Sequence, residues 1–148
     1  MSFEELESKL LREPTLERGT GATMEQVLRA EDQLGQFPPD FRRYLMTFGW
    51  VTVRHYELFG IGDTVPAYLN LEAVTLEERQ DFGLPQQFVA VMNNGGGDLY
   101  CFDTHHSVAG ASPIFLWDHE TREAASSGEV APSFTAWLQG KLQAGAAI

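Results

Sequence analysis

The spacing of apolar residues changes once along the chain, near residue 50, and this change constrains the fold more than any other feature. Before it, apolar residues recur three and four positions apart, which is the period of one helix face. After Trp50 the valines of Val51-Thr52-Val53 alternate with a polar residue, which is the period of a strand. Helices followed by strands are typical of an α+β protein and not of a repeated βαβ unit.

Three helices are predicted within the first 50 residues. Ser2 and Thr23 stand at expected N-caps, and each has Glu or Gln three residues later, the spacing of a capping box. The third helix begins at Pro38-Pro39, since proline in the first turn loses no helical hydrogen bond. Its apolar face consists of residues at positions i, i+3, i+4 and i+7: Phe41, Tyr44, Leu45 and Phe48.

The rest of the chain is predicted to form strands, with one short helix among them and one helix at the end. A capping box at Thr75 and Glu78 indicates a short helix that ends near Phe82, and Ser133 is expected to cap the last helix. Because short turns join successive strands, we expect a central, mainly antiparallel sheet with N-terminal helices and a closing C-terminal helix. The expected strands are residues 51–53, 56–59, 87–92, 99–102 and 114–117, with a short edge strand after residue 122.

The length of 148 residues suits a single domain, residues 1–148, that buries its own core. Hydrophobic residues make up 43% of the chain, too many for a disordered protein. No apolar run approaches the roughly 20 residues of a membrane span. The acidic start shows no signal-peptide pattern, and the one cysteine, Cys101, has no internal partner. We therefore expect cytoplasmic residence.

The chain is strongly acidic, with 21 Asp and Glu against 10 Lys and Arg and a net charge of −11. The excess is spread evenly, since residues 1–80 carry a net charge of −6 and residues 81–148 a net charge of −5. Such a surface repels nucleic acid and anionic membranes. It attracts a basic partner, although solubility alone also accounts for an acidic surface.

The run Gly95-Gly96-Gly97 is the feature most similar to a phosphate-binding loop. A P-loop, however, ends in lysine and a hydroxyl residue and is followed by a helix. Here Asp98 and a predicted strand follow the glycines. The run therefore indicates a hairpin turn, because glycine adopts positive φ without strain.

A set of histidines and carboxylates follows two predicted strands, and these residue types are common metal ligands. They would meet if the strands ending at Asp103 and Asp118 lay side by side. Yet the spacing matches no known metal motif, and such residues are frequent in exposed turns, so we expect no metal. A metal-dependent hydrolase using Asp103, His105, Asp118 and His119 stays open as a hypothesis. The full set is Asp103, His105, His106, Asp118, His119 and Glu120.

The sequence gives little support to nucleophilic catalysis or to a bound cofactor. Cys101 lies among apolar residues, where a thiol stays protonated, and no G-x-S-x-G elbow is present. Of the three tryptophans, Trp117 and Trp137 lie within apolar patterns and are expected in the core. Trp50, which follows a helix end, has the best chance of exposure among the three, and an exposed tryptophan would suit a protein partner; packing in the core is the alternative. We predict no catalytic residue and no cofactor.

Several blocks, taken in order, resemble the SUKH superfamily, the Smi/Knr-type domain. The resemblance covers about residues 20–140. Asn94 stands where the family usually has an acidic or another polar residue before the glycines, and Phe37 stands where leucine is usual. The blocks are the helix 23–34, Phe37-Pro38-Pro39-Asp40-Phe41-Arg42-Arg43-Tyr44-Leu45, Phe48-Gly49-Trp50, Glu57-Leu58-Phe59-Gly60, Gly95-Gly96-Gly97-Asp98-Leu99-Tyr100, Asp103-Thr104, Trp117-Asp118-His119-Glu120 and Ser133-Phe134 with Trp137-Leu138.

The resemblance implies an α+β domain without enzymatic activity. Bacterial members are largely immunity proteins that bind and neutralise a toxin, often a nuclease, in contact-dependent or polymorphic toxin systems. Eukaryotic members regulate cell-wall synthesis as interaction scaffolds, so a scaffold or regulatory module without a toxin is the alternative. Asp98 and Asp103 are expected to cap their own hairpin in preference to contacting a partner. The partner-binding candidates taken from the matching blocks are Trp50, Glu57, Asp98, Asp103, Asp118 and Glu120.

Overall fold

The computed structural model describes residues 2–121 and 123–146. In this part of the chain, seven strands form one sheet in chain order, and each neighbouring pair is antiparallel. The predicted α+β fold with an antiparallel sheet and a closing helix is confirmed. The elements are α1 (Phe3–Leu11), β1 (Glu17–Arg18), α2 (Met24–Leu34), α3 (Pro39–Phe48), β2 (Val51–Val53), β3 (Tyr56–Leu58), the 3₁₀ turn η1 (Ala67–Leu69), α4 (Leu71–Asp81), β4 (Phe88–Asn93), β5 (Leu99–Asp103), β6 (Ile114–Asp118), β7 (Glu123–Ala131) and α5 (Phe134–Ala146).

The helix caps follow from local hydrogen bonds. Thr23 Oγ1 accepts from the Gln26 N–H at 3.1 Å and the Gln26 side chain accepts from the Thr23 N–H at 2.9 Å, which completes the predicted capping box. Ser2 accepts from the Glu5 N–H, but the Glu5 carboxylate accepts from the Ser2 hydroxyl instead of its backbone. The last helix is capped by Ser133, which accepts from the Ala136 N–H.

The start of α4 differs from the prediction. The helix begins at Leu71 because Asn70 Oδ1 accepts from the Ala73 N–H at 3.0 Å. Thr75 therefore lies inside the helix, buried, where its hydroxyl accepts from the Ala90 N–H of β4 at 3.4 Å. The predicted Thr75–Glu78 capping box is wrong, since asparagine caps as well as threonine does and stands earlier. The helix ends at Asp81, close to the expected residue.

Two strand predictions also needed correction. The two-residue β1 was not predicted, and β7 extends over nine residues where a short edge strand was expected. The short β1 is recognisable only through its pairing with β2, where Glu17 lies opposite Thr52. A two-residue segment carries no periodicity of its own.

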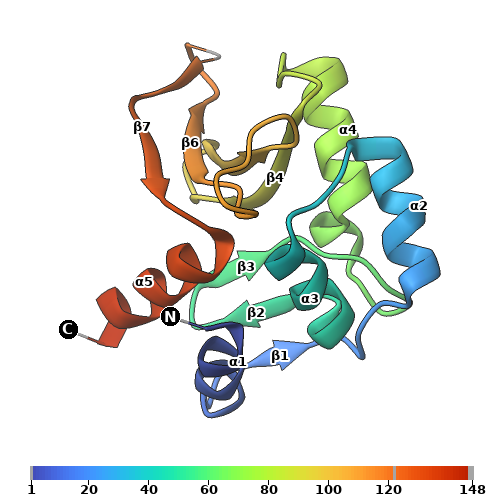
Figure 1. Ribbon diagram of the computed structural model, residues 1–148, viewed down its shortest axis with the longest axis vertical. Helices are drawn as coiled ribbons and strands as arrows, with labels where there is room; N and C mark the ends of the chain where they lie inside the picture. The colour runs from blue at the N-terminus through green and yellow to red at the C-terminus, as the bar shows by residue number, and fades with distance from the viewer. Residues whose placement is uncertain (1, 122, 147–148) are drawn as a thin grey trace.

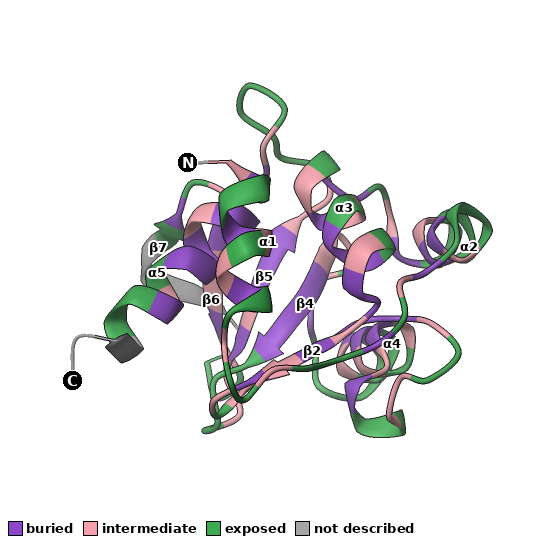
Figure 2. Ribbon diagram, turned by 90° about the horizontal axis from the view of Figure 1, so that it is seen from below, coloured by how far each residue is buried: buried purple, intermediate pink, exposed green. Residues whose placement is uncertain are grey.

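One face of the sheet packs against α3 and α5 through aromatic rings. The ring of Phe41 lies 5.2 Å from that of Phe102 on β5 and 5.1 Å from that of Phe134 on α5, measured between centroids. The Tyr44 hydroxyl donates to the Phe59 carbonyl at 2.9 Å. All of these side chains are buried, as is most of β4 and β5 in Figure 2. Burial on this scale contributes about 1.5–3 kcal/mol per large apolar side chain.

The other face of β4 is covered by α4 and tied to it by Arg79. This buried guanidinium donates to the carbonyls of Leu34 at 2.7 Å and Phe88 at 3.0 Å, so it joins the end of α2, α4 and the start of β4. Figure 1 shows α2 and α4 together on one side of the molecule, away from α5. The position of α4 is thus set by a cation bonded to backbone carbonyls.

The sheet narrows between β3 and β4. These strands pair at Leu58 and Met92, with one further hydrogen bond from the Phe59 N–H to the Val91 carbonyl at 3.0 Å. In Figure 1, β2 and β3 lie in the lower half of the molecule and β4, β6 and β7 in the upper half. The strands diverge on either side of this narrow junction and leave a cleft.

Candidate functional site

A hollow lies where β3 and β4 diverge, and we call it the β3–β4 cleft. Its volume is about 530 Å³. Tyr56 and Glu57 of β3 and Tyr68 of η1 line one side, Glu78 of α4 lines another, and Lys141 enters from α5. The floor is formed by residues of β4 and β5, and the glycine loop closes one end. Six separate elements and the glycine loop therefore contribute to one cavity.

Glu57 and Tyr68 form a hydrogen-bonded pair on the rim of this cleft. The Tyr68 hydroxyl donates to Glu57 Oε2 at 2.8 Å, and the carboxylate raises the pKa of Tyr68. The ring of Tyr68 is nevertheless 61% exposed. The bond ties the hydroxyl of this exposed tyrosine to β3 at the edge of the cleft.

A second hollow of about 420 Å³ lies on the other side of the Glu57–Tyr68 pair. Trp50 and Glu17 line it, and Glu17, Thr52 and Glu57 form one row across β1, β2 and β3. Trp50 is half-buried, and its ring N–H donates to the Thr64 hydroxyl at 3.1 Å. The structure thus brings the predicted residues Trp50 and Glu57 together, and Trp50 is partly exposed.

The ammonium group of Lys141 contacts two tyrosines of the cleft, Tyr100 and Tyr56. Its Nζ donates to the Tyr100 hydroxyl at 2.7 Å and lies 4.4 Å from the centroid of that ring and 6.0 Å from that of Tyr56. The Tyr56 hydroxyl in turn donates to the Lys141 carbonyl at 3.3 Å. The ammonium is held by the quadrupoles of the rings, and no described carboxylate lies within 4 Å of it.

Glu78 is a half-buried carboxylate on the α4 wall. Burial raises its pKa, and the neighbouring Glu77 adds to this, while His119 partly opposes it. No described residue donates a hydrogen bond to it. Glu78 was predicted only as a capping residue, because its position in the cleft depends on how α4 lies against β3 and β4.

The glycine loop between β4 and β5 is organised by two asparagines. Asn93 Oδ1 accepts from the N–H groups of Gly95 and Gly97, and Asn94 Oδ1 accepts from those of Gly96 and Asp98. The hairpin predicted for this segment is confirmed by the pairing of β4 with β5. The loop amides that would contact a phosphate are engaged by these side chains.

Asp98 connects this loop to the turn that follows β6. Its Oδ1 accepts from the His119 N–H at 3.1 Å and lies 2.5 Å from His119 Nδ1. The bond to the imidazole lowers the pKa of Asp98, and the same bond raises the pKa of His119. Asp98 therefore bonds to the neighbouring hairpin and not only to its own, in contrast to the expectation.

Asp118 lies beside this pair. Leu99 pairs with Trp117, so Asp98 and Asp118 stand next to each other at one end of β5 and β6. One ligand atom from each of Asp98, Asp118 and His119 lies within 4.8 Å of the others. Asp118 already accepts from the N–H groups of Glu120 and Thr121. These hydrogen bonds already use part of the capacity of the three residues to bind a cation.

Asp103 lies at the opposite end of the sheet, which corrects the metal hypothesis. Because β5 and β6 are antiparallel, β5 ends where β6 begins, and Asp103 pairs with Phe88 of β4. Its carboxylate accepts from the His105 N–H at 2.8 Å and shapes the local turn. Asp103 and His105 therefore do not meet Asp118 and His119, and the expectation that Asp103 caps its own turn is confirmed.

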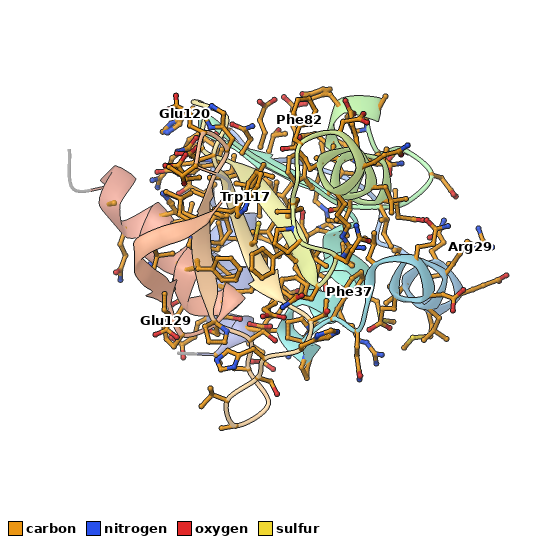
Figure 3. All side chains as sticks on the ribbon, turned by 90° about the horizontal axis from the view of Figure 1, so that it is seen from above. Arg29, Phe37, Phe82, Trp117, Glu120 and Glu129 are labelled. Atoms are coloured by element: carbon orange, nitrogen blue, oxygen red, sulfur yellow. The ribbon has the colours of Figure 1, made fainter. Side chains whose placement is uncertain are left out.

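Of the remaining residues considered in the sequence, three lie in the core and one lies at the surface. Trp117 and Trp137 are buried in the core, as predicted. Cys101 is fully buried, and burial raises the pKa of its thiol, so it is not a nucleophile. Glu120 lies at the outer edge of the molecule, whereas Trp117, three residues before it, lies inside (Figure 3).

These features match one family. The chain agrees with the family model SUKH_5, described as SMI1-KNR4 cell-wall, over residues 1–143. The chain belongs to the SUKH family. A solved structure of the same fold, a protein from Pseudomonas syringae pv. tomato, is 22% identical, with a TM-score of 0.67 over 92% of this chain and 95% of that one.

A comparison with curated protein sequences finds no match to this SUKH protein. None of its described helices has the length and apolar character needed to cross a membrane. The family match confirms the resemblance found from the ordered sequence blocks and extends it over α1, which those blocks did not include.

Proposed function

We propose that this SUKH protein is a cytoplasmic immunity protein. It binds and neutralises a toxin domain, for example a nuclease domain, within a bacterial polymorphic or contact-dependent toxin system. Family membership supports a role in protein interaction. The observation that carries the proposal is that two carboxylates, Glu57 and Glu78, line one cavity in a chain with a net charge of −11.

The carboxylates fall into two adjoining groups. Glu57 and Glu78 line the β3–β4 cleft itself. Asp98, Asp118 and Glu120 follow at the far side of the glycine loop that closes the cleft, and His119 acts on both groups through its charge. We call these five carboxylates the acidic rim. A toxin that binds nucleic acid presents a basic face of matching charge.

We infer that the protein acts by binding to its partner and blocking it, and not by catalysis. Two groups suited to chemistry are already engaged: Lys141 by its hydrogen bond to Tyr100, and Cys101 by burial. A bound acidic surface blocks a basic active site by exclusion and by charge. Neither a cofactor nor a metal ion is required for this.

Capture of partners from the native cell tests the proposal. We expect the tagged protein to retain a protein whose expression alone stops growth and whose effect is reversed by co-expression. Capture of an endogenous protein without toxicity, for example a component of cell-wall synthesis, would support the scaffold alternative and contradict the immunity role. Turnover of a substrate by the purified protein would contradict both.

A further inference from the structure

The β3–β4 cleft contains acceptor capacity that the protein itself does not use. Glu78 is half-buried, and no described residue donates a hydrogen bond to its carboxylate. Glu57 has one oxygen bonded by Tyr68, and its other oxygen receives no hydrogen bond from the described residues. Glu57 is exposed, whereas the Glu78 carboxylate is partly removed from water without a donor, which is unfavourable. A cation that enters the cleft would relieve this cost.

The charge inside the cleft is not balanced by Lys141. That ammonium is directed to Tyr100 and Tyr56, and it forms no ion pair within 4 Å with a described carboxylate. Two carboxylates therefore face one lysine, in a protein whose total charge is −11. The potential in the cleft favours a further positive group and disfavours an acidic one.

The shape of the open acceptors favours a guanidinium. Glu57 and Glu78 belong to different elements, β3 and α4, and both line the same cavity, so a ligand that bonds to both needs several donors. The exposed ring of Tyr68 stands at the rim between them and the solvent. A guanidinium has five donors in one plane and stacks on aromatic rings, whereas an ammonium is a compact, strongly hydrated charge.

We propose that the β3–β4 cleft is a receptor for one arginine side chain of the partner, with Glu57 and Glu78 accepting its N–H groups and Tyr68 stacking on its plane. This inference rests on the proposed function for the origin of the arginine, since a basic toxin face supplies such side chains. The cleft chemistry itself can be tested without any toxin.

The probe is N-acetyl-arginine amide, titrated into the ¹⁵N-labelled full-length protein and followed by NMR. We expect saturable shifts at Tyr68, Glu78 and the glycine loop, weaker binding of N-acetyl-lysine amide, and none of the neutral isostere N-acetyl-citrulline amide. Equal binding of the citrulline compound, shifts confined to other surfaces, or no shifts up to the solubility limit would overturn the inference.

The variant Glu78→Gln, with Glu77→Gln as its matched control, identifies the acceptor. Glu77 is the adjacent residue of α4, is exposed and lies outside the cleft. Glu78→Gln should weaken arginine binding about twofold to fivefold, the range of one partly solvated charge pair, and Glu77→Gln should leave it nearly unchanged. Equal losses in the two variants would mean that general charge, and not the cleft, binds the probe.

The variant Glu78→Gln is expected to fold. Glu78 is partly desolvated and lacks a hydrogen-bond donor, so its neutral isostere removes an unfavourable burial of charge. We expect a thermal midpoint at or above that of the wild-type protein. A dispersed NMR spectrum of Glu78→Gln confirms that loss of binding is local.

The captured partner separates this inference from the proposed function. A toxin that binds Glu78→Gln and Glu57→Gln as tightly as the wild-type protein overturns the arginine site and leaves the immunity role intact. Binding of the arginine probe by a protein whose captured partners are not toxins overturns the immunity role and leaves the arginine site intact.

Discussion

Asp98 and His119, 21 positions apart in the chain, join the β4–β5 loop to the turn after β6 by two hydrogen bonds, one to the histidine backbone and one to its ring. The pair stands at the end of the sheet beside Asp118. It fixes the position of the glycine loop, which in turn closes one end of the β3–β4 cleft. The shape of the cleft thus depends on a contact outside it.

This pair makes stability dependent on pH in a defined window. The pKa of Asp98 is lowered from its ordinary 3.8, so its contribution is present above that pH and is lost as the pH falls through the lowered value. The pKa of His119 is raised from its ordinary 6.5, so its contribution is complete below that pH and is lost as the pH rises through the raised value. The contribution is greatest between pH 3.8 and pH 6.5.

Histidine NMR titration and thermal unfolding check this window. In Asp98→Asn the pKa of His119 should fall toward its ordinary value. Asp118→Asn, which removes a smaller charge effect, should lower it less. The thermal midpoint of the wild-type protein should exceed that of Asp98→Asn by more at about pH 5.5 than at about pH 9. A constant difference across this range would contradict the ion pair.

Gly97 is predicted to be essential for the same contact. Its φ is +100°, and a Cβ placed there would lie 3.1 Å from the His119 ring. Gly97→Ala should therefore cost about 1–3 kcal/mol of unfolding free energy and lower the pKa of His119. Gly95→Ala is the matched control, since Gly95 has a φ of +95° and nothing within 4 Å of its Cβ position. Denaturant unfolding of both variants should show the smaller loss for Gly95, and equal losses would refute crowding at His119.

The start of α4 is tested at Asn70. Asn70→Ala removes the acceptor of the Ala73 N–H and should lower the free energy of unfolding by about 1 kcal/mol. Asn70→Asp keeps an acceptor at the same place and should retain most of the stability. Chemical denaturation measures both. A larger loss in Asn70→Asp than in Asn70→Ala would contradict the cap.

The elements that were predicted well depend on local sequence. The capping box of Thr23 and Gln26 and the apolar face of α3 involve residues at most seven positions apart. Their hydrogen bonds and burial form within one helix or on one side of it. For the same reason Trp117 was placed in the core from its apolar strand alone.

The candidate site was predicted only in part, because it is built from long-range contacts. Trp50 and Glu57 were found individually, but the cleft depends on how far β3 diverges from β4. Glu78 and Lys141 enter it from helices whose positions the sequence pattern does not specify. The hypothesis that Asp103 meets Asp118 was wrong for another reason. In an antiparallel sheet the neighbouring strands β5 and β6 necessarily end at opposite edges.

The most direct test of the account is the salt dependence of the association rate between this protein and its captured partner. Between about 50 and 500 mM salt the Debye length shrinks to a few Å. If the acidic rim attracts a basic face, the rate constant should fall at least about tenfold, with a smaller change in dissociation. An association rate that does not change with salt would contradict recognition by charge.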